Sequence, residues 1–430
     1  MARERDVFAK AALRLLPLMA LLYVVNILDR VNVGFAALEM NKDLGIGPEG
    51  FGFIGGVFFI GYFIFEIPSN VMLERVGARR WIFVILLVWS LVSMSTALAR
   101  DIRTLTALRF TLGLAEGGFF PGMMLYLSYW FPQKNRARYT ALFLAAIALA
   151  NVVGAPLSGA ILSMKPVAGV HNWQWLFVLE GAPAFLLAFA VLKWLPDGPK
   201  DARWLGEKDR NTILAALAAE PPREHHAMWP MLKDRRIWLL IAPDYLIVLA
   251  QWGVWLWLPQ IVHSLGYSIF GTTLVIAGLY AASFVGSLLW AMSSDRTGER
   301  IWHIVIPCLV AAGGLIAAAA VHGNLASIAA LEFAAVGLAA CVTVFWVLPT
   351  RFLGGTAAAG GIALINSIAN LGGFCGPYLV GWLKARTGDY SAGMDAMALC
   401  MILAAVLVLA LGRAMHLRAA GRGGIAGTGA

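Results

Sequence analysis

Charged side chains occur inside long apolar stretches of this sequence, where they could bind an ion or transfer a proton. Asp29 and Arg30 are adjacent within the apolar run 15–38, and Arg109 and Glu116 lie seven residues apart in a later run. Residues seven apart share one face of a helix. A guanidinium is a permanently charged, planar donor that fits a carboxylate, whereas a buried carboxyl group can bind and release a proton. The pattern therefore predicts anion binding combined with proton transfer.

Arg30 is the leading candidate ligand for an anionic substrate, because its planar set of donors matches a carboxylate. The alternative is that Arg30 only neutralises a neighbouring acid. Asp29 is rotated by about 100° from Arg30 around the helix, so we expect it to contact another helix, with the one that contains Arg109 and Glu116 as the candidate. We predict that Asp29, Glu116 and Arg109 take part in proton coupling. The alternative is a static Asp29–Arg109 ion pair between helices.

Further polar and aromatic side chains could line the same binding site. Asn366 and Asn370 are four residues apart, on one face of a helix. Their amides could bind hydroxyl or carboxyl oxygens of a substrate, or equally could hydrogen-bond a neighbouring helix in a tightly packed region. Tyr62 and Trp346 are further candidates for the lining of the site, and for Trp346 core packing is the alternative.

The elements that must position these residues are membrane helices. The chain has 430 residues, of which 60% are hydrophobic and 13% charged, whereas soluble domains carry about 25% charged residues. A bilayer is crossed by about 20 apolar residues in a helix. We predict an all-α membrane protein whose twelve transmembrane helices occupy, approximately, residues 15–38, 51–73, 81–99, 104–131, 139–164, 173–195, 237–264, 270–293, 301–321, 325–350, 357–383 and 395–417.

A polar stretch, 196–236, separates these segments into two sets of six. We therefore predict an N-terminal six-helix bundle over 1–195, a cytoplasmic linker over 196–236, a C-terminal six-helix bundle over 237–417 and a flexible tail over 418–430. Within the linker we expect a short amphipathic helix around residues 204–219.

The orientation follows from the distribution of lysine and arginine. If both termini are cytoplasmic, the inner segments hold 24 of these residues and the outer loops hold 6. Cytoplasmic loops carry the excess of basic residues in membrane proteins. We therefore expect a multi-pass protein of the cell (inner) membrane with both termini in the cytoplasm. The net charge of +9 is explained by this distribution, so no nucleic-acid partner is expected.

The two halves of the chain carry a repeated loop motif. An acid, an arginine, a glycine and a second arginine recur at the same spacing, 221 residues apart, in 74–79 and 295–300. The repeat indicates a duplicated six-helix unit, and transporters built from such repeats bind substrate near the bilayer midplane where the repeats meet. We expect the charged residues of the two loops to form an inner gate: Glu74, Arg75, Arg79, Asp295, Arg296 and Arg300.

These loops resemble the loop signature of the major facilitator superfamily, although Asn70 and Ala291 replace the usual glycine and Glu74 stands where aspartate is commoner. Longer stretches resemble the anion:cation symporter family within it: 28–35, 61–70, 109–122, 175–181 and 366–377. The resemblance implies the fold of that superfamily, with two pseudo-symmetric six-helix bundles. It also implies import of a small organic anion together with protons, the known substrates being tartrate, galactonate and other sugar acids, phthalate and hydroxyphenylacetate.

Other classes of protein are disfavoured by motifs that the sequence lacks. It contains neither GxxxxGK[ST], which an ATP-driven pump would need, nor HExxH, which would indicate a zinc enzyme. We therefore expect no enzymatic activity, no metal ion and no cofactor, with the proton as coupling ion, in a protein that works as a monomer. The alternative function on the same fold is a proton-independent exchanger or uniporter of organic anions.

Overall fold

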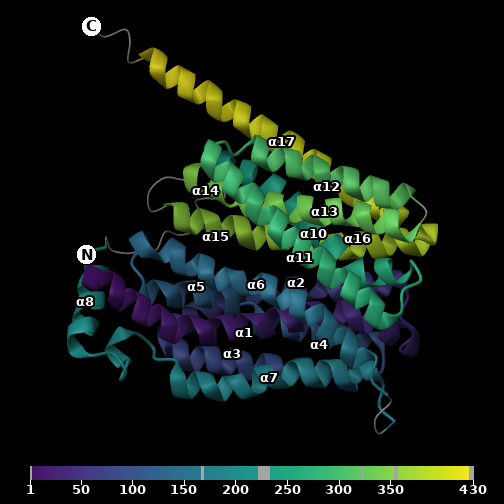
Figure 1. Ribbon diagram of the computed structural model, residues 1–430, viewed down its shortest axis with the longest axis horizontal. Coiled ribbons are helices and arrows are strands. Elements are labelled where there is room, and N and C mark those ends of the chain that lie inside the picture. Colours follow the sequence, from purple (N-terminus) through teal and green to yellow (C-terminus); the bar gives the residue numbers. More distant parts are fainter. Residues whose placement is uncertain (1, 166–168, 221–232, 322, 353–356, 426–430) are drawn as a thin grey trace. The chain divides into compact units, whose positions relative to one another are not determined.

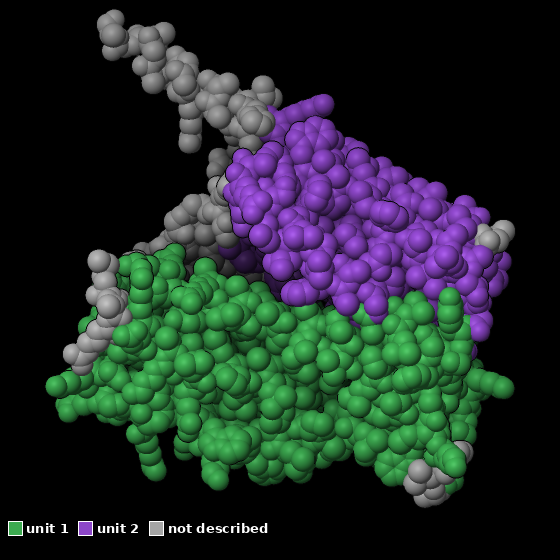
Figure 2. Space-filling model, in the orientation of Figure 1, with its two compact units in different colours: residues 1–223, 267–277 green, residues 224–266, 278–430 purple. Residues whose placement is uncertain are grey.

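The structure, a computed structural model, describes residues 2–165, 169–220, 233–321, 323–352 and 357–425. It divides into two compact units, which Figure 2 shows in green and purple. Unit 1 comprises residues 1–223 and 267–277, and unit 2 comprises residues 224–266 and 278–430. The parts of the linker and of the tail that were predicted within 221–232 and 426–430 lie outside the described residues.

Unit 1 is built from helices that follow one another along the first half of the chain (Figure 1). In chain order these elements are α1 (Ala2–Asp43), α2 (Pro48–Val76), α3 (Ala78–Ser95), η1 (Thr96–Leu98), α4 (Ile102–Glu116), α5 (Phe119–Trp130), α6 (Gln133–Leu162), α7 (Asn172–Trp194), η2 (Pro199–Asp201) and α8 (Glu207–Ala218).

Unit 2 holds the helices of the second half of the chain, apart from the first turns of α11, which group with unit 1. They are α10 (Arg235–His263), α11 (Ile269–Thr297), α12 (Trp302–Ala320), α13 (Asn324–Phe345), α14 (Val347–Phe352), α15 (Ala357–Asn370), α16 (Gly372–Thr387) and α17 (Ser391–Ile425). The last helix continues into the stretch that was predicted as a flexible tail.

The predicted class, an all-α membrane protein, is confirmed. Within the described residues, ten helices are long and apolar enough to cross a membrane. The predicted segments 104–131 and 357–383 are each split into two shorter helices, so the expectation of one continuous helix was wrong for both. Glycines lie at both breaks. They weaken a helix by about 1 kcal/mol relative to alanine, and here they also allow close contact with a neighbouring helix.

The contact between α2 and α4 shows how glycine decides the packing of unit 1. A Cβ atom on Gly61 would lie 2.3 Å from the carbonyl oxygen of Phe110, and one on Gly113 would lie 2.0 Å from that of Phe58. No side chain fits at such distances, so each glycine lets the backbone of one helix lie against the other. On the other side of the unit, α7 packs against both α1 and α3 (Figure 1).

The linker helix is confirmed as α8, which begins at Glu207. It packs on α1, where the ammonium group of Lys10 lies 2.9 Å from a carboxylate oxygen of Asp209. Upstream of α8, the indole ring of Trp204 stacks on that of Trp130 at the end of α5, with the ring centroids 5.7 Å apart. Residues 196–220 of the linker therefore belong to unit 1.

Candidate functional site

Arg30 and Glu116 form a buried ion pair between α1 and α4. The Arg30 Nη2 atom lies 3.2 Å from Oε2 of Glu116, and Nδ2 of Asn26 donates a hydrogen bond of 2.9 Å to the same oxygen. The Glu116 side chain is fully buried, whereas that of Arg30 is 13% exposed. The other carboxylate oxygen of Glu116, Oε1, has no hydrogen-bond partner among the described residues. The sequence thus predicted both charges, and the fold brings them together.

Glycines beside Glu116 allow this pairing. Glu116 is the last residue of α4, and Gly117 follows it where the helix breaks. A Cβ atom on Gly117 would lie 2.6 Å from the backbone oxygen of Tyr62. Because this glycine lets α4 end directly against α2, the carboxylate is placed beside the middle of α1.

Two aromatic rings of α2 lie beside the guanidinium of Arg30, and one of them also lies beside that of Arg109. The Cζ atom of Arg30 lies 5.3 Å from the ring centroid of Phe58 and 5.2 Å from that of Tyr62, and Cζ of Arg109 lies 5.1 Å from the Phe58 centroid. Cations at such distances are attracted to the ring, the more so when they are removed from water. Tyr62 therefore lies beside Arg30, as predicted for a lining residue. Phe58, which contacts both arginines, was not predicted, because one more phenylalanine in an apolar segment carries no signal.

Arg109 is buried without a carboxylate contact. Its side chain is 1% exposed, and its Nε and Nη1 atoms have no hydrogen-bond partner among the described residues. A buried guanidinium without acceptors is unfavourable, so a bound anion would satisfy donors that the protein leaves unpaired.

Asp29 contacts another helix, as expected, but among the described residues its hydrogen bonds go to α3 and not to the candidate α4. Its carboxylate accepts hydrogen bonds from Nε1 of Trp89 at 2.7 Å, from Oγ of Ser93 at 2.9 Å and from Nδ2 of Asn32 at 3.3 Å. The physical reason is the rotation of about 100° between successive helix residues, which directs Asp29 toward α3 while Arg30 faces α2 and α4. The alternative, a static Asp29–Arg109 ion pair, is therefore not found among the described residues, although the two charges interact electrostatically. Trp89 and Ser93, four residues apart on one helix face, were the overlooked signal.

The unit 2 candidates lie on α15 and at the junction between α13 and α14. Asn366 and Asn370 are half-buried in α15, and Trp346 is half-buried between α13 and α14, with its ring 6.2 Å from that of Phe345. Asn366 has an interaction within the structure. The role of Asn366, Asn370 and Trp346 in substrate binding stays a prediction.

The two gate loops differ in their ion pairs. In the second loop, Nη2 of Arg300 lies 2.7 Å from Asp295, and Nη1 of Arg300 donates to Oγ of Ser294 at 2.6 Å. In the first loop, the backbone N–H of Arg79 donates to Asp197 at 2.8 Å. The other predicted gate residues are exposed: Glu74, Arg75 and Arg296.

Both loops depend on their glycine. Gly77 and Gly298 have φ angles of 96° and 70°, a region that side chains disfavour. A Cβ atom on Gly77 would also lie 2.8 Å from Oδ1 of Asp197. The acid that meets the first loop therefore comes from the segment after α7, which the repeat pattern gave no reason to single out.

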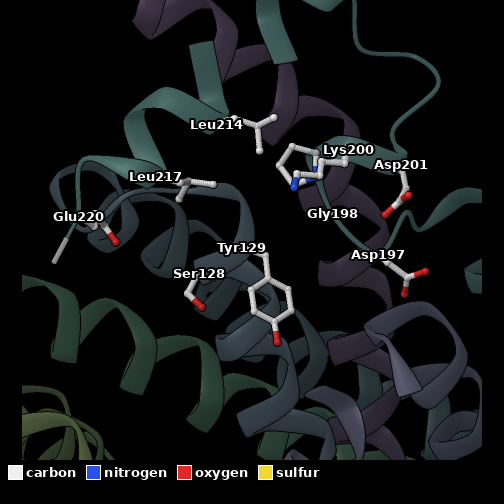
Figure 3. Close-up of a pocket in the computed structure, with 10 residues that line it drawn as sticks. Ser128, Tyr129, Asp197, Gly198, Lys200, Asp201, Leu214, Leu217 and Glu220 are labelled. Carbon is white, nitrogen blue, oxygen red and sulfur yellow. The ribbon is translucent and has the colours of Figure 1, made fainter. Parts of the chain in front are cut away.

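A surface hollow of about 450 Å³ lies beside the linker of unit 1. Figure 3 shows Tyr129 at the end of α5 below it, with Asp197 and Lys200 on one side and Leu214 and Leu217 of α8 on the other. None of the predicted site residues lines this hollow, so we do not assign the substrate to it. No cluster of three or more histidine, cysteine or acidic side chains that could hold a metal ion occurs in the described part of the chain.

Comparison with known proteins agrees with this architecture. The family model described as "Major Facilitator Superfamily" matches residues 19–377. A "putative tartrate transporter" of Agrobacterium vitis is 43% identical over 415 residues, covering 95% of this chain and 92% of the relative. A "quinolone resistance transporter" of Acinetobacter baumannii is 39% identical over 414 residues, covering 94% of each chain.

A solved structure shows the same fold at low sequence identity. It is a bacterial homologue of the human lysosomal transporter Spinster in an inward-facing and occupied conformation, with a TM-score of 0.75 and 18% identity. The match covers 93% of this chain and 96% of that one. The predicted all-helical transporter fold is therefore confirmed, and ten of the expected membrane-spanning helices are recognisable within the described residues.

Proposed function

Because this chain belongs to the major facilitator superfamily, and is thus a membrane transport protein and not an enzyme, we propose that it imports a small organic anion by proton symport. The proposal is carried by the direct contact between Arg30 and Glu116. In this contact the guanidinium of Arg30, which can bind a carboxylate, touches the carboxyl group of Glu116, which can bind a proton. Both lie in a buried environment, so the charge of each strongly affects the other.

The pair couples the two ligands by competition for one guanidinium. When a substrate carboxylate binds Arg30, Glu116 loses its cationic partner. Two buried carboxylates beside one cation would leave an uncompensated negative charge, which is strongly unfavourable. A proton on Glu116 removes that charge. Anion binding and proton binding therefore favour each other, and by linkage the effect is reciprocal.

The surroundings of the pair support an anion with more than one polar group. Arg109 lies against the same Phe58 ring as Arg30 and has unpaired donors among the described residues. A second carboxylate or a hydroxyl group of the substrate would satisfy them. We therefore propose a hydroxy or dicarboxylate such as tartrate, a sugar acid or an aromatic carboxylate. The relatives named as tartrate transporters, at 43% identity, favour the first of these.

We place the protein in the cell inner membrane, with both termini in the cytoplasm. The support is the distribution of 24 basic residues to one side and 6 to the other. With this orientation the two gate loops lie on the cytoplasmic side, where their ion pairs and hydrogen bonds would open and close as access alternates.

Uptake of radiolabelled tartrate into liposomes that contain the purified protein tests the proposal. With an acidic exterior and a neutral interior, we expect accumulation above the external concentration, which a protonophore abolishes. An exchanger would instead need an anion inside the liposome and would not respond to the pH gradient. Uptake that equilibrates without accumulation would contradict symport.

A thermal-shift screen of the purified protein against small organic acids tests the substrate class. A ligand that binds only the folded state raises its stability as its concentration exceeds the Kd. We expect stabilisation by hydroxy dicarboxylates, sugar acids or aromatic carboxylates but not by the corresponding uncharged polyols. Stabilisation by the polyols alone would contradict an anion site.

A further inference from the structure

Unit 1 contains a second buried carboxyl group that the Arg30–Glu116 pair does not use. Glu180 lies on α7, and only 2% of the residue is exposed to solvent. The Ser158 hydroxyl of α6 donates a hydrogen bond of 2.6 Å to its Oε1 atom. Its Oε2 atom has no hydrogen-bond partner among the described residues. Such a group needs an explanation, because a buried polar atom without a hydrogen-bond partner is unfavourable.

Glu180 and Asp29 face the same polar residue. The Asn32 amide donates to Asp29 at 3.3 Å, and it also interacts with the Glu180 carboxyl group. The two acids interact electrostatically, and Asp29 interacts in the same way with Glu116. A series of three buried acids therefore leads from α7 through α1 to the end of α4.

The ionisable groups around Glu180 include no cation that pairs with it. Within the described residues, no ion pair involves Glu180 or Asp29, and Arg30 is paired with Glu116. Beyond its first turns, α1 carries the acids Asp29 in its middle and Glu39 and Asp43 toward its end, where Asp43 pairs with His171 at the start of α7. The helices packed against α7 also carry basic residues, but none of them forms an ion pair with Glu180 among the described residues; they include Lys10, Arg14, Arg30 and Lys42 on α1, Arg79 and Arg80 on α3, and Lys134, Arg136 and Arg138 on α6.

Arg109 interacts electrostatically with Asp29, but no cation forms an ion pair with either acid among the described residues. Two neighbouring buried carboxylates without a cation in direct contact are strongly unfavourable together, so one of them takes a proton. The hydrogen bonds distinguish the two acids. Asp29 accepts three hydrogen bonds, from Trp89, Ser93 and Asn32, which suits a carboxylate. Besides its interaction with Asn32, Glu180 receives one hydroxyl hydrogen bond, from Ser158, and its Oε2 atom has no hydrogen-bond partner among the described residues, which suits a neutral acid.

We propose that Glu180 and Asp29 form one proton-binding pair, in which Glu180 carries the proton in this conformation, and that the pair takes part in proton coupling. This inference rests on the proposed symport. In the step that the pair performs, an O–H bond of Glu180 breaks and an O–H bond of Asp29 forms, so that Glu180 becomes the carboxylate and Asp29 the acid. Interacting acids of this kind titrate as a pair and not as separate residues.

The Glu180→Gln substitution tests the pair, because glutamine keeps the size and neutrality of the protonated side chain but cannot release a proton. Glu332→Gln, which changes a glutamate of α13 in unit 2, is the matched control. For both variants we would measure thermal stability, tartrate counterflow, tartrate uptake driven by a pH gradient and the infrared carbonyl band of protonated carboxyl groups.

We expect Glu180→Gln to keep its thermal stability and to keep counterflow within about twofold of the unsubstituted protein. Gradient-driven accumulation should fall at least tenfold, and part of the infrared band should disappear, while Glu332→Gln keeps gradient-driven accumulation. Glu180→Asp should recover part of the accumulation, because it restores an ionisable group.

Three results would contradict the proposal that Glu180 and Asp29 form a proton-binding pair. One is an unchanged infrared band in Glu180→Gln. Another is gradient-driven accumulation equal to that of the unsubstituted protein. The third is a loss of counterflow in a folded variant, which would assign Glu180 a structural role. If the unsubstituted protein shows no gradient-driven uptake, the proposed symport fails, and the infrared band then decides on the proton of Glu180 independently of transport.

Discussion

The guanidinium of Arg30 and the carboxylate of Glu116 approach to 3.2 Å, although 86 residues separate them along the chain. Asn26, one turn before Arg30 on α1, donates to the same oxygen of Glu116. One helix therefore supplies two donors to the acid that ends another. This arrangement makes the protonation state of Glu116 and the occupancy of Arg30 depend on each other.

Replacing Arg30 with lysine should weaken binding of a carboxylate substrate by about 10- to 100-fold. Lysine keeps the charge but loses the planar pair of donors, and a hydrogen bond to a charged group contributes about 1.5–3 kcal/mol. Isothermal titration of the purified variant measures the change. Arg103→Lys, at an exposed position, is the control, and an unchanged affinity in Arg30→Lys would remove Arg30 from the binding site.

Replacing Glu116 with glutamine should separate exchange from proton-driven transport. The amide mimics the protonated acid in size and lack of charge, so counterflow of substrate across the liposome membrane should persist. Accumulation driven by a pH gradient should be lost, because no proton can be released from this position. If accumulation survives in this variant, the coupling group must be sought elsewhere, with Asp29 as the next candidate.

The Gly113→Ala substitution should destabilise the protein by about 1–3 kcal/mol, the usual cost of inserting atoms into a packed interior. The added Cβ atom would lie 2.0 Å from the carbonyl oxygen of Phe58, so α2 and α4 must separate and Phe58 must move from both arginines. Thermal unfolding in detergent measures the loss. Gly278→Ala is the matched control, because nothing lies within 4 Å of its Cβ position; equal stability of the two variants would contradict the packing described here.

The loop between α11 and α12 should make stability depend on pH. Partial burial acts to raise the pKa of Glu299, but hydrogen bonds from the His303 ring and from the backbone N–H groups of Trp302 and His303 outweigh it and hold the pKa below its usual 4.5. A lowered pKa stabilises the fold above the pKa of the unfolded chain, and this stabilisation disappears as the pH falls through the folded-state value.

The Glu299→Gln variant should therefore unfold at a lower temperature than the unsubstituted protein at neutral pH, and the difference should vanish in acid. Unfolding curves measured from neutral to acidic pH provide the test. Glu74→Gln, an exposed acid of the first gate loop, should show no such difference. If the difference in unfolding temperature between Glu299→Gln and the unsubstituted protein stayed constant with pH, the lowered pKa of Glu299 would be contradicted.

The sequence by itself determined the class of protein and the chemistry available to it. Apolar segments of bilayer length have few structural solutions, because backbone groups in lipid must be satisfied within a helix. The cost of placing charge among them made Asp29, Arg30, Arg109 and Glu116 conspicuous without coordinates. The repeated loop motif also predicted two related halves without coordinates, because the same spacing of acid, arginine and glycine recurs 221 residues later in the sequence.

Only the tertiary structure decided which of these charges meet. The direction of Asp29 depends on how α1 is rotated against its neighbours, and α6 accommodates that rotation at Gly154, where a Cβ atom would lie 2.1 Å from Cδ2 of Leu28. The same packing turns Asp29 toward Trp89 and Ser93, and it leaves Glu116 to Arg30. A helical pattern specifies the angle between two residues of one helix, but not which other helix each of them faces.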